Sequence, residues 1–401
     1  MPQFLRVIFH EFLVLLMKTI AGLQPGASHR TFIGSGSSRN LCHHIANTGA
    51  KRVLVVTDKP LRELGVVDKA VEGLVEKGLD VAYYDGVLPD PTYQQVAEGV
   101  AVQRENQSDV VLAIGGGSSL DAAKIICASA TSDADPKDWV GFGKVKHEIL
   151  PFFAIPTTSG TGSEATMGAV ISDNETHEKG VISGADLLPN AAALDADLIL
   201  GLPPHITAAT GMDALTHAIE AYISVWDRGS RKEDSRLAVK LIFDPLETAY
   251  NDGGNREARE AVALGAYYGG VAINQVHVGN VHAIAHQIGG KYGIPHGLAN
   301  SLLLPSVLEF CREEAQADLA ELARLIGAGE EGASEEQLSR AFIQAVRDLR
   351  EAVGIAATSD KIQAADYDYL TDLALAEGMQ YPVPKLLDRQ SVKDLLAGIT
   401  A

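Results

Sequence analysis

Two segments of the chain carry side chains that could hold a metal ion. Residues 211–220 read Gly-Met-Asp-Ala-Leu-Thr-His-Ala-Ile-Glu, and the spacing of four places Asp213 and His217 on one face of a helix. A later segment adds His282, expected on a helix, and His296, expected after a turn. One carboxylate and three imidazoles suit a metal that prefers nitrogen and oxygen ligands, such as Fe²⁺ or Zn²⁺. We therefore predict a divalent metal site at these four residues.

Spacing alone does not decide which histidines are ligands. His282 and His286 are also four residues apart, so both could bind one ion, and His277 is a further candidate. A single helical histidine is more often a capping or core residue than a ligand. Two such pairs in an otherwise apolar stretch favour a metal site over a chance arrangement.

Composition indicates an ordinary globular protein. With 401 residues, 46% hydrophobic and 21% charged, the chain is long enough for two domains and a large core. A formal charge of −19 argues against a nucleic-acid partner, because phosphate binding needs a concentrated positive surface. The three cysteines, Cys42, Cys127 and Cys311, have no metal-binding or disulfide spacing, and we expect a cytoplasmic protein.

The first 25 residues form an apolar extension. Their longest run without a charge or a histidine is residues 12–17, shorter than the ~18 apolar residues of a membrane span or the ~7–15 of a signal peptide core. Arg6, Glu11 and Lys18 interrupt the rest. We expect an amphipathic helix or irregular segment that docks on its own protein or on a second subunit, and no membrane partner. The alternative is that the segment results from an upstream start site.

Residues 26–203 read as an α/β domain. Short runs of apolar residues are followed in turn by helical stretches. Within each run polar residues do not alternate with apolar ones, which is typical of parallel strands covered on both faces. The expected strands are residues 52–57, 80–84, 109–114 and 152–155. After Pro203 and Pro204 the β-branched runs disappear and a helical period takes over, so residues 204–401 are predicted to be all-helical. Ligands of such a sheet bind beyond the carboxyl ends of its strands.

Two loops after predicted strands suit a dinucleotide. The first reads Gly115-Gly-Gly-Ser-Ser-Leu-Asp121 and leads into a helix, whose first N–H groups could bind a pyrophosphate. The second reads Pro156-Thr-Thr-Ser-Gly-Thr-Gly-Ser-Glu164, and its five hydroxyls exceed the needs of a helix cap. Asp58, after the first strand, could accept hydrogen bonds from ribose hydroxyls and repel a 2′-phosphate, which favours NAD over NADP. Alternatively, it could cap a helix.

These motifs, in this order and with Pro295-His-Gly297, resemble those of the iron-containing (group III) alcohol dehydrogenases. The resemblance runs from about residue 30 over nearly the whole chain. It implies a Rossmann-like dinucleotide-binding domain with a parallel sheet, followed by an all-helical metal-binding domain. It also implies that Fe²⁺ is the metal, with Zn²⁺ as an alternative, and that the protein is a homodimer or larger.

The resemblance assigns roles that spacing left open. Asp213, His217, His282 and His296 match the family's metal ligands, while His286 matches a histidine near nicotinamide and substrate, suited to proton relay. The positions that match nucleotide contacts are Asp58, Gly116, Gly117, Ser118, Asp121, Thr157, Thr158, Thr161 and Lys179.

Departures from the family pattern concern the substrate pocket and one nucleotide contact. Asp90 replaces the common Asn between two prolines, and Ile273 and Gln275 stand where many members carry Phe and Asn. His277 is also unusual, and residues 381–385 only loosely follow the usual Asn-Pro-Arg pattern. We expect an altered substrate range.

The expected activity is NAD-dependent hydride transfer between a primary alcohol, activated as a metal-bound alkoxide, and nicotinamide. Glycerol dehydrogenase-like and maleylacetate reductase-like oxidoreductases are the nearer alternatives. A lyase like 3-dehydroquinate synthase would need several cationic side chains around the metal, and the ligand segments offer only Lys291. A protein that binds NAD or metal without catalysis would show a broken ligand set or glycine loop, and both are intact.

Overall fold

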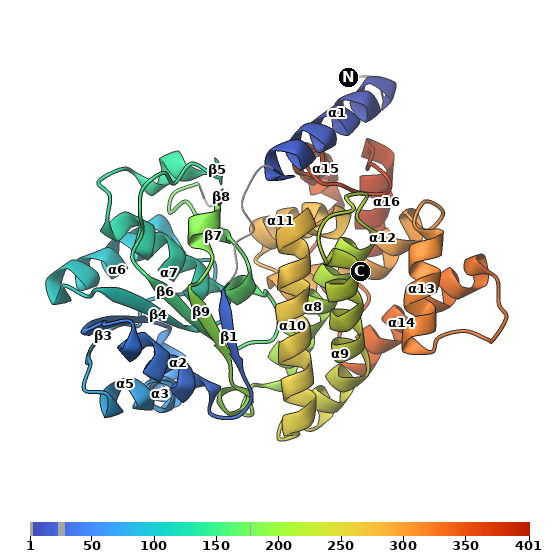
Figure 1. The fold of residues 1–401 in the computed structure, drawn as a ribbon. Coiled ribbons are helices and arrows are strands. Elements are labelled where there is room, and N and C mark those ends of the chain that lie inside the picture. Colours follow the sequence, from blue (N-terminus) through green and yellow to red (C-terminus); the bar gives the residue numbers. More distant parts are fainter. Residues whose placement is uncertain (1–2, 23–28, 177) are drawn as a thin grey trace. The chain divides into compact units, whose positions relative to one another are not determined.

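The computed structural model describes residues 3–22, 29–176 and 178–401, which group into two compact units (Figure 1). One unit contains residues 27–202 and 253–267, and the other contains residues 1–26, 203–252 and 268–401. Residues 1–2 and 23–25 of the expected N-terminal extension lie outside the described residues. No helix in the described ranges combines the length and apolarity that a bilayer span requires.

The first unit is built on a sheet of six parallel strands, in the order β1-β9-β6-β4-β2-β3 across the described residues. The strands are β1 (Arg30–Ile33), β2 (Arg52–Val56), β3 (Asp80–Tyr84), β4 (Val110–Gly115), β6 (Phe152–Pro156) and β9 (Ala191–Leu194). The four strands predicted from the sequence are confirmed as β2, β3, β4 and β6. The short alanine run of β9 carries too weak a strand signal to be predicted.

Helices cover both faces of this sheet (Figure 1). They are α2 (Ser37–Asn47), α3 (Lys59–Glu63), α4 (Val66–Ala70), α5 (Glu72–Glu76), α6 (Tyr93–Asn106) and α7 (Gly117–Ala130). Leu54 and Val56 of β2 lie in the core with α6 and α7, while Val53 and Val55 lie in the core with α2, α4 and α5. The inner strands β2, β4 and β6 are buried on both sides, which explains their apolar runs without alternation.

A second, three-stranded sheet was not expected from the sequence. It contains β5 (Gly141–Phe142), β7 (Gly168–Ser172) and β8 (Lys179–Ser183), and β7 and β8 pair antiparallel. Short 3-10 helices connect this region, at Pro136–Trp139, Ser163–Ala165, Ala185–Leu187 and Ala196–Leu198. Strand β8 of this small sheet begins at Lys179, one of the residues predicted to contact the nucleotide.

Helices make up the regular structure of the second unit's described residues, which confirms the all-helical prediction. They are α1 (Gln3–Gly22), α8 (Pro204–Ile223), α9 (Arg231–Asn251), the later part of α10 (Arg256–Val276), α11 (Asn280–Tyr292), α12 (His296–Phe310), α13 (Gln316–Ile326), α14 (Glu335–Ala352), a 3-10 turn (Ala364–Asp366), α15 (Tyr367–Gly378) and α16 (Arg389–Gly398). The helix α8 begins at the predicted diproline, because proline at the first helical position lacks only an N–H that has no partner there.

Candidate metal centre and nucleotide loops

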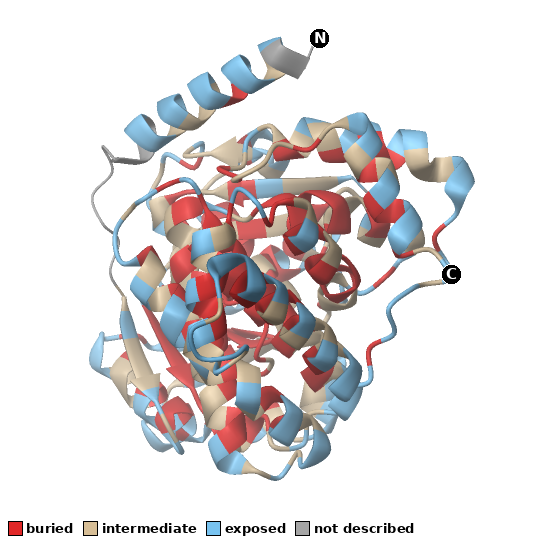
Figure 2. Cartoon of the chain, turned by 90° about the vertical axis from the view of Figure 1, so that its right-hand side faces the viewer, coloured by how far each residue is buried: buried red, intermediate tan, exposed pale blue. Residues whose placement is uncertain are grey.

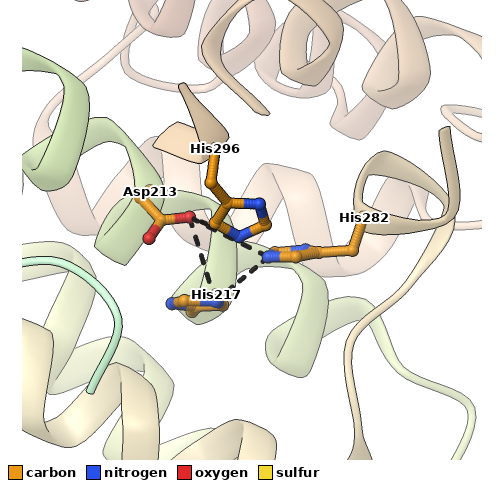
Figure 3. A group of neighbouring side chains, drawn as sticks. All are labelled: Asp213, His217, His282 and His296. Atoms are coloured by element: carbon orange, nitrogen blue, oxygen red, sulfur yellow. Dashed lines mark hydrogen bonds and ion pairs between the residues drawn. The ribbon is translucent and has the colours of Figure 1, made fainter. Parts of the chain in front are cut away.

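Three helices of the second unit bring the predicted metal ligands together. Asp213 and His217 lie one turn apart on the buried face of α8, His282 lies in the first turn of α11, and His296 begins α12. These four side chains each offer a ligand atom, and the atoms lie within 4.8 Å of one another (Figure 3).

A glycine allows α12 to approach α8 closely enough for this cluster. A Cβ atom placed on Gly297 would lie 2.2 Å from the backbone oxygen of Ala209 and 3.2 Å from the Cβ of Asp213. Backbone cannot give way at such a distance, so a larger residue would push the start of α12 away. His296 would move with it, because it is the adjacent residue.

The distances between ligand atoms fit one divalent ion. The Nε2 atoms of His217 and His282 are 3.0 Å apart, and Oδ1 of Asp213 lies 3.9 Å from each of them. Oδ1 of Asp213 lies 3.5 Å from Nε2 of His296. Ligands ~2.1 Å from a tetrahedral metal stand ~3.4 Å apart, within this range. Carboxylate and imidazole ligands also agree with the N/O preference inferred from the sequence.

The imidazole of His282 is in the form that binds a metal. Burial, followed by the neighbouring imidazoles of His217 and His296, holds the pKa of His282 well below its usual value. The ring is therefore neutral near pH 7, which leaves a lone pair on one nitrogen. The rings of His217 and His282 are stacked, with centroids 4.7 Å apart.

Glu220 determines which nitrogen of His282 carries the proton. Its Oε2 lies 2.6 Å from Nδ1 of His282, so that nitrogen donates and Nε2 faces the cluster with its lone pair. The backbone N–H groups of Gly279 and Val281 also donate to Glu220, while burial raises its pKa to about 7. Glu220 was not among the residues predicted from the sequence. The signal was present, since residues 213, 217 and 220 follow the helical i, i+4, i+7 pattern.

Asn300 is a second residue that sequence reasoning missed. Its Nδ2 donates to Oδ1 of Asp213 at 2.6 Å and lies 3.1 Å from Nε2 of His282 and 3.2 Å from Nε2 of His296. It follows His296 by four residues on α12, a spacing that could have indicated it. The amide thus orients the carboxylate toward the histidines.

His286 lies beside the cluster rather than in it. Its ring stacks on that of His296, with centroids 5.2 Å apart, and its Nδ1 is 2.6 Å from Oε1 of Glu377 on α15. The side chains of Gln287 and Tyr381 also donate to Glu377, each at 2.6 Å. Burial alone would raise the pKa of Glu377, but His286 and these donors lower it, so the carboxylate is charged at neutral pH.

The unusual residues in the last turn of α10 and directly after it have partners other than the metal cluster. His277 has a left-handed backbone (φ 65°), and its ring contacts Trp226 edge-on and stacks near Tyr381. Gln275 accepts from the N–H of Ser230 at 2.9 Å and donates within its own unit. Ile273 packs on the apolar cluster that contains Trp226.

The two nucleotide loops meet because their strands are neighbours in register. In the parallel pair β4 and β6, Gly115 lies opposite Pro156, and the N–H of Thr157 donates to the Gly115 oxygen at 2.9 Å. A Cβ on Gly117 would lie 2.6 Å from the side chain of Thr161, so only glycine permits this contact. Gly116, Gly117 and Ser118 are half-buried around the start of α7, where backbone N–H groups lack helical partners.

Asp121 faces the protein interior instead of the loop surface. Its Oδ1 accepts from Ser163 at 2.6 Å, and its Oδ2 accepts from the N–H of Val170 at 2.9 Å. The buried ammonium of Lys124, one turn later, donates to the backbone oxygen of Ser163 at 2.8 Å. Burial raises the pKa of Asp121 and lowers that of Lys124 to about 8. These residues join the two loops.

Asp58 and Lys179 each have a partner within the first unit. Oδ1 of Asp58 accepts from the N–H of Leu61 at 2.9 Å and caps α3, while Oδ2 lies at the Gly115 loop. The ammonium of Lys179 lies 2.5 Å from Oδ1 of Asp90. Asp90 therefore pairs with the predicted ribose-binding lysine.

One cavity of this unit lies away from the two loops. A cavity of about 840 Å³ is lined by His29, Arg30, Asp109, Val110 and Pro151, at the amino ends of β4 and β6. The glycine loop follows the carboxyl end of β4, so this cavity lies at the opposite edge of the sheet from the predicted nucleotide loops.

A parallel α/β unit with a glycine-rich loop, joined to a helical unit with a buried Asp/His cluster, defines a class of metal-dependent dehydrogenases. The profile "Iron-containing alcohol dehydrogenase" matches residues 28–196, and that of the C-terminal domain of the Fe-containing family matches residues 207–400. The chain belongs to the iron-containing alcohol dehydrogenase family and is an alcohol/aldehyde oxidoreductase.

Sequence relatives cover most of the chain. It is 38% identical over 348 residues to a 1,3-propanediol dehydrogenase of Klebsiella pneumoniae, covering 86% of this chain and 90% of that protein. It is 38% identical over 329 residues to a lactaldehyde reductase of Escherichia coli K12, covering 81% and 85%. A crystal structure of 1,3-propanediol oxidoreductase superposes with a TM-score of 0.89 at 36% identity, covering 92% and 97%.

Proposed function

We propose that this enzyme transfers hydride between the carbinol carbon of a small primary alcohol and the nicotinamide of NAD, with Fe²⁺ as its resident metal. The observation that carries the proposal is the cluster of Asp213, His217, His282 and His296, ordered by Glu220. An NAD-dependent methanol dehydrogenase of Bacillus methanolicus, 38% identical over 323 residues, supports the choice of cofactor.

Asp213, His217, His282 and His296 would hold the metal. A divalent ion bound there supplies Lewis acidity, which lowers the pKa of an alcohol hydroxyl and polarises an aldehyde carbonyl. Fe²⁺ is preferred over Zn²⁺ on the family's name, and the three buried cysteines supply no thiolate to the cluster.

His286 would carry the proton. With Nδ1 held by the charged carboxylate of Glu377, its Nε2 is left to accept the proton released by the alcohol and to return it in aldehyde reduction. Tyr381 and Gln287 keep Glu377 in place, so the ring is oriented before substrate arrives.

The two loops of the α/β unit would bind NAD. The backbone N–H groups of Gly116, Gly117 and Ser118 would bind the pyrophosphate, and Asp58 Oδ2 would accept ribose hydroxyls and repel the 2′-phosphate of NADP. Thr157, Thr158, Thr161 and Lys179 would add contacts, while Asp121 would position the loops from within. We further propose residues 26–203 and 204–401 as the nucleotide and metal domains of a cytoplasmic homo-oligomer.

The test is NADH absorbance with a panel of alcohols and aldehydes that includes methanol, 1,3-propanediol and lactaldehyde. Protein purified anaerobically and stripped with a chelator is reconstituted with Fe²⁺, Zn²⁺ or Ni²⁺ singly. We expect turnover with NADH and highest activity with Fe²⁺. Absence of turnover with every pair, despite bound metal and NAD, would refute the proposal.

A further inference from the structure

The N-terminal helix α1 is fastened to its own unit along one face. His10 Nε2 lies 2.8 Å from the backbone oxygen of Tyr381, and the guanidinium of Arg6 donates to the oxygen of Leu387 at 3.4 Å. Val14 and Met17 pack against the apolar cluster of Ala221, Trp226, Ala272 and Val276. The helix is therefore ordered by its own subunit before any partner binds.

The opposite face of α1 presents large apolar side chains to solvent. They are Leu5, Ile8, Phe9, Phe12, Leu15 and Leu16, each between 43% and 64% exposed. Figure 2 shows this helix, beside the N-terminus, largely in the colour of exposed residues. Burying large apolar side chains stabilises a protein, so a row of them exposed to water indicates a contact surface.

The row has the seven-residue period of a helix that packs on another helix. Leu5, Phe12 and Thr19 repeat every seven residues, and Ile8 and Leu15 form the alternate line of the same seam. A repeat of 3.5 residues keeps one seam facing a partner helix along its length. The residues of α1 that contact its own subunit lie on the opposite face of the helix from this seam.

Charges beside the seam select the orientation of the partner. Glu11 and Lys18 are seven residues apart and exposed, so they flank the same edge of the seam. In an antiparallel pair with Phe12 opposite Leu15 of a second copy, Glu11 falls beside Lys18 of that copy, and symmetry repeats the contact. A parallel pair would place Glu11 beside the apolar Leu16 instead.

We propose that the exposed face of α1 binds α1 of a second copy of this chain in an antiparallel, two-fold symmetric pair. Two heptads are too short to pair as free peptides, but α1 is already held by its own subunit, which reduces the entropy lost on association. In this orientation the N-terminal end of each helix lies near the C-terminal end of the other, so the two helix dipoles attract.

A membrane surface fits this face less well. The chain carries a formal charge of −19, and Glu11 lies beside the seam, whereas helices that bind anionic bilayers present clusters of Lys and Arg. A second copy matches both the apolar row and the pair of opposite charges.

Charge reversal in the full-length protein tests the pair. Glu11→Lys or Lys18→Glu places like charges together twice, so we expect the dissociation constant, measured by sedimentation velocity, to rise about tenfold or more. The double variant E11K/K18E restores opposite charges and should return to within about threefold of the unmodified protein. Leu64→Glu, at an exposed residue of the other unit, is the matched control for added surface charge. If both single variants associated as tightly as the unmodified protein, the proposal would be overturned.

Cysteine crosslinking detects the α1 contact even where another surface also joins the subunits. A mixture of the F12C and L15C proteins should form a disulfide-linked heterodimer under mild oxidation, well above the yield from either protein alone. The native cysteines are buried, so they do not compete. Strong self-crosslinking of F12C would refute the antiparallel arrangement. Sedimentation of the unmodified protein with phosphatidylserine vesicles, abolished by Phe12→Glu, would refute the second copy as occupant.

Discussion

Nδ1 of His286 lies 2.6 Å from Oε1 of Glu377, which joins α11 to the end of α15 and leaves Nε2 of the imidazole for a proton. Glu377→Gln keeps the shape but removes the charge that stabilises the protonated ring. We expect kcat to fall about 10- to 100-fold with metal content unchanged. Steady-state kinetics with elemental analysis measures both quantities. Loss of metal in this variant would instead make Glu377 part of the metal site.

Substitutions at His282 and at His286 should differ in their effect on metal binding. His282→Ala removes a ligand and should abolish stoichiometric iron, whereas His286→Ala should retain iron and lose turnover. Elemental analysis of the two proteins, purified side by side without oxygen, makes the comparison. Equal loss of iron in both would contradict the division of roles.

Glu220 should affect metal affinity without touching the metal. Glu220→Gln weakens the bond that holds the His282 tautomer, and such changes lower metal affinity by about 10- to 100-fold. Competition with a chromophoric chelator gives the dissociation constant. Glu321→Gln, at a residue outside the cluster, is a suitable control. Unchanged affinity in E220Q would show that His282 is oriented by packing alone.

Asp58 caps the start of α3 and is also proposed to contact the cofactor. Two substitutions distinguish these roles. Asp58→Ser keeps a capping oxygen for the N–H of Leu61 but removes the charge, so kcat/KM with NADP should rise about tenfold at little cost in Tm. Asp58→Ala also loses the cap, which costs about 1 kcal/mol of stability. Cofactor kinetics and thermal melting check both. Unchanged preference for NAD in D58S would remove Asp58 from cofactor selection.

Glu164 should make stability depend on pH. Burial raises its pKa from 4.5 to about 7, so between these values the folded protein holds a proton that the unfolded chain has released. Its contribution is fully present below pH 4.5 and is lost as pH rises to 7. Glu164→Gln cannot ionise, so its stability relative to the unmodified protein should rise by up to about 3 kcal/mol across this window.

Thermal melting at pH 5 and pH 8 measures the effect of Glu164→Gln. The exposed Glu331→Gln provides the control for a substitution at a solvated carboxylate. Parallel changes of Tm with pH in the unmodified and E164Q proteins would contradict the predicted titration.

Much of the architecture follows from local sequence patterns. Strands β2, β4 and β6 are apolar on both faces, and the helical period after Pro203 persists to the end of the chain, so both were predictable. Asp213 and His217 were predictable as a pair because their spacing belongs to a single helix. Strand β9 and the small sheet of β7 and β8 were not, because sequence-distant pairing decides them.

The sequence by itself determined the residue types of the site: one carboxylate, several imidazoles and a glycine loop after a strand. Only the tertiary structure decided which side chains meet, because α8, α11, α12 and α15 converge through packing that no spacing encodes. It paired His286 with Glu377 and turned Asp121 inward. It also supplied Glu220 and Asn300, whose roles depend on hydrogen bonds between separate helices.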